Sequence, residues 1–233
     1  ALKQLGLWKM QDIELEVSIN VSCNHLQAPS FFTTLDELLE VNPNVDSHNL
    51  QLEILESSAL GELQIMSSII KTCREALGVK VALDDFGTGH SSLAHLRNLS
   101  ADTIKIDQSF VRDMLDDPND YAIIDSVIGL SDSFNRDVIA EGVEQVEHGL
   151  MLLVMGCERA QGYAIARPMP ANEFIEWLKD YTPNQTWIDC GNTVRTAKEL
   201  KLKLHALAVD RWESCFEANI RTAPEKVDFW PIM

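Results

Sequence analysis

Basic residues are scarce in this chain. Its 233 residues include 19 Lys and Arg against 36 Asp and Glu, a formal net charge of −17 at pH 7. A protein that coats nucleic-acid phosphates needs a basic face, so we expect no direct DNA binding. The charge is still compatible with a phosphate-containing substrate, because a bridging metal cation reverses the local field of acidic residues.

Signals for disulfides, membrane spans and secretory leaders are also lacking. The five cysteines are an odd number and none forms a Cys-x-x-Cys pair, which favours buried thiols in a reducing compartment. No stretch approaches the ~20 apolar residues of a membrane span, and the N-terminus has no signal-peptide pattern. We predict a cytoplasmic chain, whose parent protein could be membrane-anchored.

What the chain does contain is a steady alternation of short extended runs and amphipathic helical stretches. The predicted strands are Glu14–Ser22, Asn49–Leu55, Lys80–Asp85, Thr103–Asp107, Asp137–Glu141 and Arg159–Tyr163. Helical periodicity marks Glu62–Leu77, Tyr121–Phe134 and Glu147–Met155. Such alternation predicts an α/β protein with a parallel sheet. Six strands indicate either a doubly wound sheet or a (β/α)8 barrel that is incomplete in this chain.

A division of the chain is predicted near residue 180. Pro183 and Asn184 interrupt the pattern within Tyr181–Asp189, and Val194–Ile220 then reads as one or two helices. We therefore predict one domain over residues 1–180 and a linker with a short helical extension over residues 181–233. No capping pattern ends the chain, so we expect the extension to be cut short.

Polar side chains stand at the carboxyl ends of the predicted strands. They are Asn20, Glu53, Asp84 with Asp85, Lys105, Glu141 and Gln161. In parallel α/β proteins these ends share one face, which carries the active site. Several of them occupy the strand positions that alternate with the most apolar positions, as residues in the interior of a barrel would. We expect them to converge in one pocket.

The predicted pocket holds four carboxylates and one lysine. Unpaired carboxylates repel one another, and hard cations such as Mg²⁺ or Mn²⁺ prefer their oxygens. Adjacent Asp84 and Asp85 can serve two metals roughly 3.5–4 Å apart, as in phosphoester cleavage. No His or Cys joins the set, which argues against structural zinc. Any one of these carboxylates could instead cap a helix or lie in a solvated loop; together they indicate a metal-assisted hydrolase or lyase.

Several segments carry a family resemblance. DDFGTGHSSL at Asp84–Leu93 is similar to the DDFGTGYSSL loop of EAL domains, with His90 in place of Tyr. Further segments resemble the family's motifs in the family's order: SINVS (Ser18–Ser22), LEILES (Leu52–Ser57), IKIDQSFV (Ile104–Val111), VIAEGVE (Val138–Glu144) and QGY…RPMP (Gln161–Pro170). The resemblance covers residues 1 to about 180.

The resemblance implies a (β/α)8 barrel that linearises cyclic-di-GMP to pGpG with two Mg²⁺ or Mn²⁺ ions. Positions that match the family's metal ligands are Asn20, Glu53, Asp84 and Asp85. Positions that match residues around the attacking water, including its general base, are Lys105, Glu141 and Gln161. Glu56 matches the glutamate that anchors the Asp84–Leu93 loop, and that loop with the helix after it forms the usual homodimer contact. Upstream sensory or GGDEF domains are common in the family.

One departure from the family concerns the Glu-Ala-Leu strand that names it. By analogy its metal-binding glutamate is expected ~60 residues before Asn20, within a barrel of about 250 residues. The chain begins at Ala1, in what reads as the helix before the Asn20 strand, so we expect an N-terminally incomplete barrel. Glu75-Ala76-Leu77 has the same letters but lies at the end of a predicted helix before Gly78, and is not assigned this role.

Two other functions are compatible with parts of the sequence. A degenerate EAL domain would act as a cyclic-di-GMP receptor or protein-interaction module, and Leu55 and His90 are deviations in that direction; the presence of every other signature position favours catalysis. In the extension, His205, Trp212 and Cys215 could belong to a metal-binding or signalling module. The apolar spacing there favours an amphipathic helix that packs on a partner.

Overall fold

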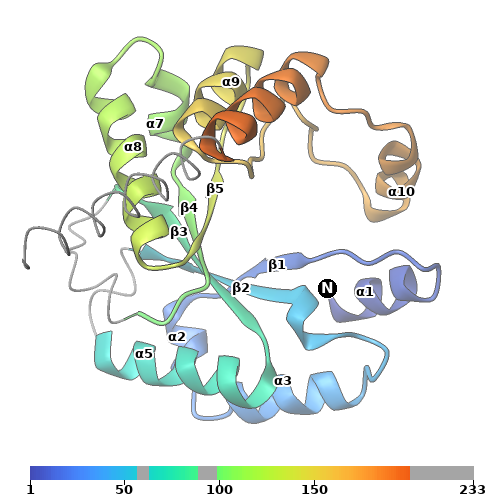
Figure 1. The fold of residues 1–233 in the computed structure, drawn as a ribbon. Helices are drawn as coiled ribbons and strands as arrows, with labels where there is room; N and C mark the ends of the chain where they lie inside the picture. The colour runs from blue at the N-terminus through green and yellow to red at the C-terminus, as the bar shows by residue number, and fades with distance from the viewer. Residues whose placement is uncertain (57–62, 89–98, 200–233) are drawn as a thin grey trace, which may run out of the picture.

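The computed structural model describes residues 1–56, 63–88 and 99–199 of the chain. Its centre is a five-stranded sheet in the order β1-β2-β3-β4-β5 (Figure 1). The strands are β1 Val17–Asn20, β2 Leu50–Leu55, β3 Lys80–Phe86, β4 Thr103–Ile106 and β5 Asp137–Ala140. All neighbouring strands run parallel, so the predicted parallel α/β architecture is confirmed.

Helices lie between the strands in sequence and continue after the last one. They are α1 Leu2–Lys9, α2 Cys23–Leu26, α3 Phe31–Glu40, α5 Leu63–Thr72, α7 Gln108–Asp113, α8 Pro118–Ser133, α9 Val146–Met155 and α10 Ala171–Asp180. Residues 185–199 are helical as well. No helix in these described parts is long and apolar enough to cross a membrane.

Local sequence signals account for several helix boundaries. The side chain of Asp117 accepts a hydrogen bond from the Asn119 amide, and Pro118 occupies the first turn of α8, where its missing N–H has no cost. The helix predicted over Glu62–Leu77 ends in a π-helical turn, Cys73–Leu77, and Gly78 terminates it with φ 72°. Glu75-Ala76-Leu77 is therefore helical, as predicted, and is not part of a strand.

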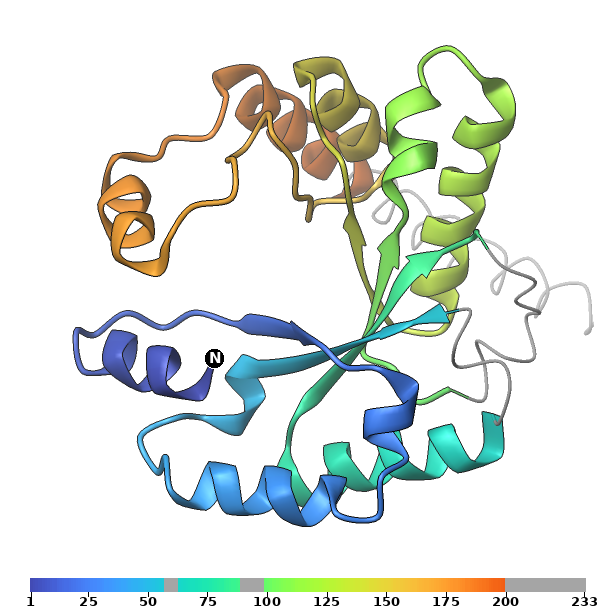
Figure 2. The ribbon, with the colours of Figure 1, turned by 180° about the vertical axis from the view of Figure 1, so that it is seen from behind.

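The core lies between the sheet and the helices on its outer face (Figures 1 and 2). In β2 the side chains of Leu50, Leu52 and Ile54 are at most 1% exposed. Successive strand residues point to opposite faces, so the residues between them face the inner side of the sheet. Those residues are polar in β2 and β4, which gives the sheet one apolar and one polar face.

A polar layer, buried at Gln51 and Thr103, crosses this inner face. Ser18 Oγ donates to Gln51 Oε1 at 2.9 Å, and Gln51 Nε2 donates to Thr103 Oγ1 at 2.9 Å. Moving two residues along each strand keeps the same face, and leads from this layer to Asn20, Glu53 and Lys105. The strand-end residues therefore rest on a hydrogen-bonded layer, in the stacked arrangement of barrel interiors.

Two of the predicted boundaries are corrected. Arg159–Tyr163 does not form a sixth strand; it contributes a single bridge, Ala160 to Ala140, because the chain turns away at Gly162 and Ala164 bonds back to Val143. The helix predicted from Val194 already begins at residue 185, because the Asn184 side chain caps the Thr186 amide. The rest of Val194–Ile220 lies outside the described residues.

Within the described residues the sheet is open, with β1 as its outer strand on one side (Figure 2). Helix α10 contacts α1 beside this opening. The rings of Phe174 and Trp8 lie 5.7 Å apart between centroids, and Phe174 also lies 5.6 Å from Trp177. The last labelled helix is thereby joined to the first one by an aromatic contact.

Candidate active site

Lys105 is the centre of the polar inner face. It lies on β4, is 4% exposed, and its Nζ contacts three carboxylates: Glu53 Oε1 at 2.9 Å, Asp84 Oδ1 at 2.8 Å and Glu141 Oε1 at 2.6 Å. These acceptors come from β2, β3 and the residue that follows β5. Four separate segments of the sheet therefore meet at one ammonium group, as the strand-end pattern predicted.

Lys105 stays charged in this setting. Its burial by itself lowers the pKa, but hydrogen bonds to Asp84, Glu141 and Glu53 outweigh burial and raise the pKa above the usual value. Burying an ammonium group without partners would cost roughly several kcal/mol, so the group would lose its proton instead. The three carboxylates are therefore what allows a cation at this depth.

One ammonium does not balance the negative charge around it. Burial raises the pKa of Glu141, and Lys105 opposes that shift. Burial also raises the pKa of Asp85, helped by the charges of Asp84 and Asp107. Both shifts disfavour the ionised carboxylates, and a bound cation would offset them.

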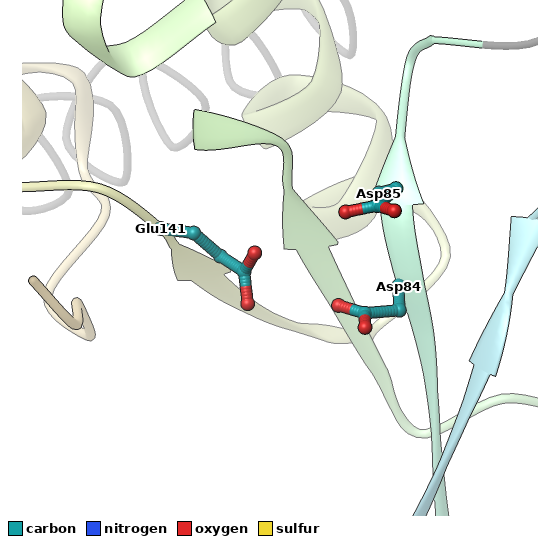
Figure 3. A group of neighbouring side chains, drawn as sticks. All are labelled: Asp84, Asp85 and Glu141. Carbon is teal, nitrogen blue, oxygen red and sulfur yellow. The ribbon is translucent and has the colours of Figure 1, made fainter. Parts of the chain in front are cut away.

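Three carboxylates are close enough to share a metal ion. One oxygen from each of Asp84, Asp85 and Glu141 lies within 4.8 Å of the others. Figure 3 shows the three side chains converging from β3 and from the end of β5. An all-oxygen ligand set suits hard cations such as Mg²⁺ and Mn²⁺ and does not resemble a zinc site. The donor chemistry thus fits a divalent cation.

An irregularity in β3 allows two consecutive aspartates to serve one site. Neighbouring strand residues normally point to opposite faces. Here the register between β3 and β4 shifts between Leu83 and Phe86, and Asp85 has φ 54°, a left-handed conformation that Asp tolerates better than most residues. The bulge turns Asp85 toward the same space as Asp84, an example of a bulge that redirects a side chain beside a site.

The remaining predicted residues lie around this centre. Gln161 Nε2 donates to Glu141 Oε1 at 2.7 Å. Asn20 ends β1 with its Cα paired to that of Glu53, and its side chain is exposed. Glu53 does not belong to the three-carboxylate group found among the described residues. The structure therefore places Asn20 at the rim of the site and Glu53 at its lysine.

Glu56 directly follows β2 in the sequence. Its side chain is buried beside the first residues of the loop after β3. Its Oε2 accepts a hydrogen bond from the Gly87 amide at 2.8 Å, and its exposure is 1%. Gly87 has φ 102°, and an added Cβ would lie 2.9 Å from the Phe110 ring. The loop can therefore begin in this position only with glycine there. Residues 89–98, with most of the predicted dimer contact, lie outside the described residues.

Asp107 was not among the predicted site residues. Its side chain accepts a hydrogen bond from the Ser109 amide and caps α7. It also lies close enough to Asp85 for its charge to raise the pKa of that carboxyl group. The sequence did indicate this position. Asp107 follows Lys105 by two residues, and residues two apart on a strand point to the same face.

Comparisons with known proteins identify the class to which this fold and site belong. The EAL domain family matches residues 1–168, and the chain belongs to that family. It is 36% identical over 179 residues to the cyclic di-GMP phosphodiesterase PA2567 of Pseudomonas aeruginosa, a match that covers 77% of this chain and 30% of that protein. The chain thus spans less than a third of the length of this curated relative.

Solved structures agree with the sequence match. The EAL domain of Mycobacterium smegmatis DcpA is similar with a TM-score of 0.73 and 32% identity, over 78% of this chain and 82% of that one. The PaMucR phosphodiesterase in complex with c-di-GMP has a TM-score of 0.71 and 31% identity, over 75% and 70% of the two chains. The TIM-like barrel predicted as the fold class is confirmed by these neighbours. The division at residue 180 stays a prediction.

Proposed function

We propose that this chain forms the catalytic part of a phosphodiesterase that hydrolyses cyclic-di-GMP to linear pGpG. The observation that carries the proposal is the buried Lys105 ammonium, which joins Glu53, Asp84 and Glu141 beside the Asp84–Asp85–Glu141 group. Relatives named as phosphodiesterases of this nucleotide support the choice of substrate. Both align over about three quarters of this chain, at 36% and 31% identity, and the solved structure has the same fold.

Two divalent cations, Mg²⁺ or Mn²⁺, belong to the proposal. Asp84 and Asp85 would hold cations, together with Glu53 and Asn20 at the neighbouring strand ends, and Glu141 lies beside Asp84 and Asp85. When bound, such cations lower the pKa of a coordinated water and offset charge on the phosphate. Titration of the chain with Mn²⁺ by calorimetry, with Asp85→Asn as the comparison, measures this site without an activity assay.

The protein's own residues have distinct tasks in this scheme. Glu141, held by both Lys105 and Gln161, is placed to accept a proton from the attacking water. Lys105 supplies a fixed positive charge where negative charge develops on the phosphate oxygens, and this kind of preorganised stabilisation is often the largest catalytic contribution. Gln161 orients the carboxylate, and Glu56 fixes the loop that begins at Gly87.

The test is hydrolysis of cyclic-di-GMP by the protein at its natural length, with Mn²⁺ and chromatographic detection of pGpG. Glu141→Gln and Lys105→Met should each lower kcat by at least about 10²-fold, the range for loss of a general base or a charge-stabilising group. Glu37→Gln, a change at an exposed glutamate on α3, is the matched control and should retain activity. Full activity of either site variant would contradict the assigned roles, and tight nucleotide binding without pGpG would indicate a receptor instead.

The cellular setting and the assembly of the protein belong to the proposal as well. Unpaired thiols at Cys73 and Cys157 suit the reducing cytoplasm. The proposal includes a homodimer through the Asp84–Leu93 loop and the helix after it. It also includes an upstream sensory or GGDEF domain, because both features are common in the EAL family. Light scattering of the natural-length protein with and without Mn²⁺ tests the dimer.

A further inference from the structure

We propose that Trp187, in the segment after the barrel, is a positioning residue for residues 141–145, here called the Glu141 loop. The docking of residues 185–199 on α9 would then set the catalytic rate. The proposal rests on the phosphodiesterase function proposed above. It concerns a part of the chain that lies beyond the residues matched by the EAL family, which end at 168.

The first step is the contact between Trp187 and α9. The indole Nε1 donates a hydrogen bond to the Val146 carbonyl at 2.8 Å. Gly149, one turn further along α9, leaves room for the ring, since an added Cβ would lie 2.5 Å from Nε1 and 2.6 Å from Cε2. Glycine inside a helix is less favourable than alanine, at a cost in helix stability. The close approach of the indole gives a reason for that cost.

The second step leads from α9 to the catalytic residue. Val146 is the first residue of α9, and it follows Glu141 by five positions. The Glu144 amide donates to His148 Nδ1 at 3.4 Å, and the Val143 amide donates to the Gln161 carbonyl at 3.0 Å. The loop that carries Glu141 is thus held at its far end by α9, and in its middle by the segment that carries Gln161.

The third step concerns how lightly the extension is held. In residues 185–199 the positions that are partly buried are Trp187, Cys190, Gly191 and Val194, a single stripe at helical spacing. A cavity of about 470 Å³ lies between this helix and α9, and its walls include Val143 and Ala160, neighbours of the two catalytic segments. Incomplete packing forfeits dispersion contacts. Residues 185–199 can therefore separate from α9 at modest cost. The surface that they would uncover includes Val143 in the Glu141 loop.

Two variants separate docking from helix stability. Gly149→Ala favours the helical state of α9 by propensity but pushes the indole away, whereas Gly129→Ala in α8 adds a methyl group that meets nothing within 4 Å. If propensity alone mattered, both changes would be neutral or stabilising. On the proposal, Gly149→Ala impairs catalysis and Gly129→Ala does not.

The experiment measures kcat and KM, and amide hydrogen exchange, in the natural-length protein with Mn²⁺. Trp187→Ala and Gly149→Ala should lower kcat by roughly 10- to 100-fold with KM changed by no more than about threefold, as expected for a misplaced catalytic group. Amides of residues 142–149 should exchange faster, while those of β2 keep their protection. Trp187→Phe retains the ring without the N–H donor and should recover part of the loss.

Two results would overturn the proposal. One is wild-type kcat together with wild-type exchange at residues 142–149 in both Trp187→Ala and Gly149→Ala. The other is faster exchange in β2 to the same degree, which would mean general destabilisation. Exchange is measured without substrate, so it decides the coupling even if the wild-type protein fails to hydrolyse cyclic-di-GMP.

Discussion

At the scale of single residues, backbone conformation decides which side chains can act together. Asp84 and Asp85 are adjacent, and regular strand geometry would direct them to opposite faces. The register shift in β3 and the positive φ of Asp85 bring both to one place. The Asp-Asp pair was visible in the sequence as a candidate ligand pair, but the bulge that makes it one was not.

Cys157 gives a pH prediction at the same scale. Burial raises the pKa of its thiol to about 11, and the side chain is 4% exposed. The folded state keeps this proton while an unfolded thiol loses it above about pH 8.5. The associated stability is therefore complete below pH 8.5 and is lost between about pH 8.5 and 11, by up to about 3 kcal/mol.

The measurement is the urea midpoint from pH 7 to pH 10.5. Cys157→Ala should flatten the alkaline fall in stability relative to the wild type, whatever its effect at pH 7. Cys190→Ala, at a half-buried thiol on the extension, is the control and should leave the slope as it is. Equal slopes in wild type and Cys157→Ala would show that this thiol has the same pKa in the folded and the unfolded protein.

At the scale of elements, the strands are joined beneath the site by hydrogen bonds between side chains. Gln51 is 1% exposed and links Ser18 on β1 to Thr103 on β4, passing β3 at Ala82. An alternation of polar and apolar residues was readable in β2. The pairing of these three side chains depends on the register and stagger of strands far apart in the sequence, which periodicity does not specify.

Gln51→Leu should lower the free energy of unfolding by about 1–3 kcal/mol, because it leaves the buried Thr103 hydroxyl without this partner. Guanidinium denaturation followed by circular dichroism measures the change. Gln11→Leu, at an exposed glutamine, is the matched control with an expected change within about 0.5 kcal/mol. A Gln51→Leu variant as stable as the wild type would mean that the layer contributes packing alone.

At the scale of the whole molecule, the first and last labelled helices meet beside the open side of the sheet. Trp8 of α1 and Phe174 of α10 are in ring contact, although α10 contains no fully buried residue. Nothing in the periodicity of either helix pairs them. Their contact follows from the curvature of the sheet, which brings the beginning and end of the barrel segment together (Figure 1).

A double-mutant cycle with Trp8→Leu and Phe174→Leu tests this contact. The coupling energy should be about 0.5–1.5 kcal/mol, the range for aromatic pairs, measured from urea midpoints of the four proteins. Pairing Trp8→Leu with Phe134→Leu, at the exposed end of α8, gives the reference cycle and should yield additivity. Additive effects in the first cycle as well would show that α1 and α10 do not interact in solution.

The sequence by itself determined the family, the parallel α/β class and the set of strand-end side chains, because motif order and period-2 phase are local properties of the chain. It indicated a sixth strand that the structure reduces to one bridge, and it left Asp107 out of the site. Tertiary structure alone decided that Lys105 bonds three carboxylates at once, that Asp85 turns toward Asp84, and that Trp187 meets Gly149. Each of these depends on distances between residues remote in sequence, or on a backbone irregularity that only neighbouring strands impose.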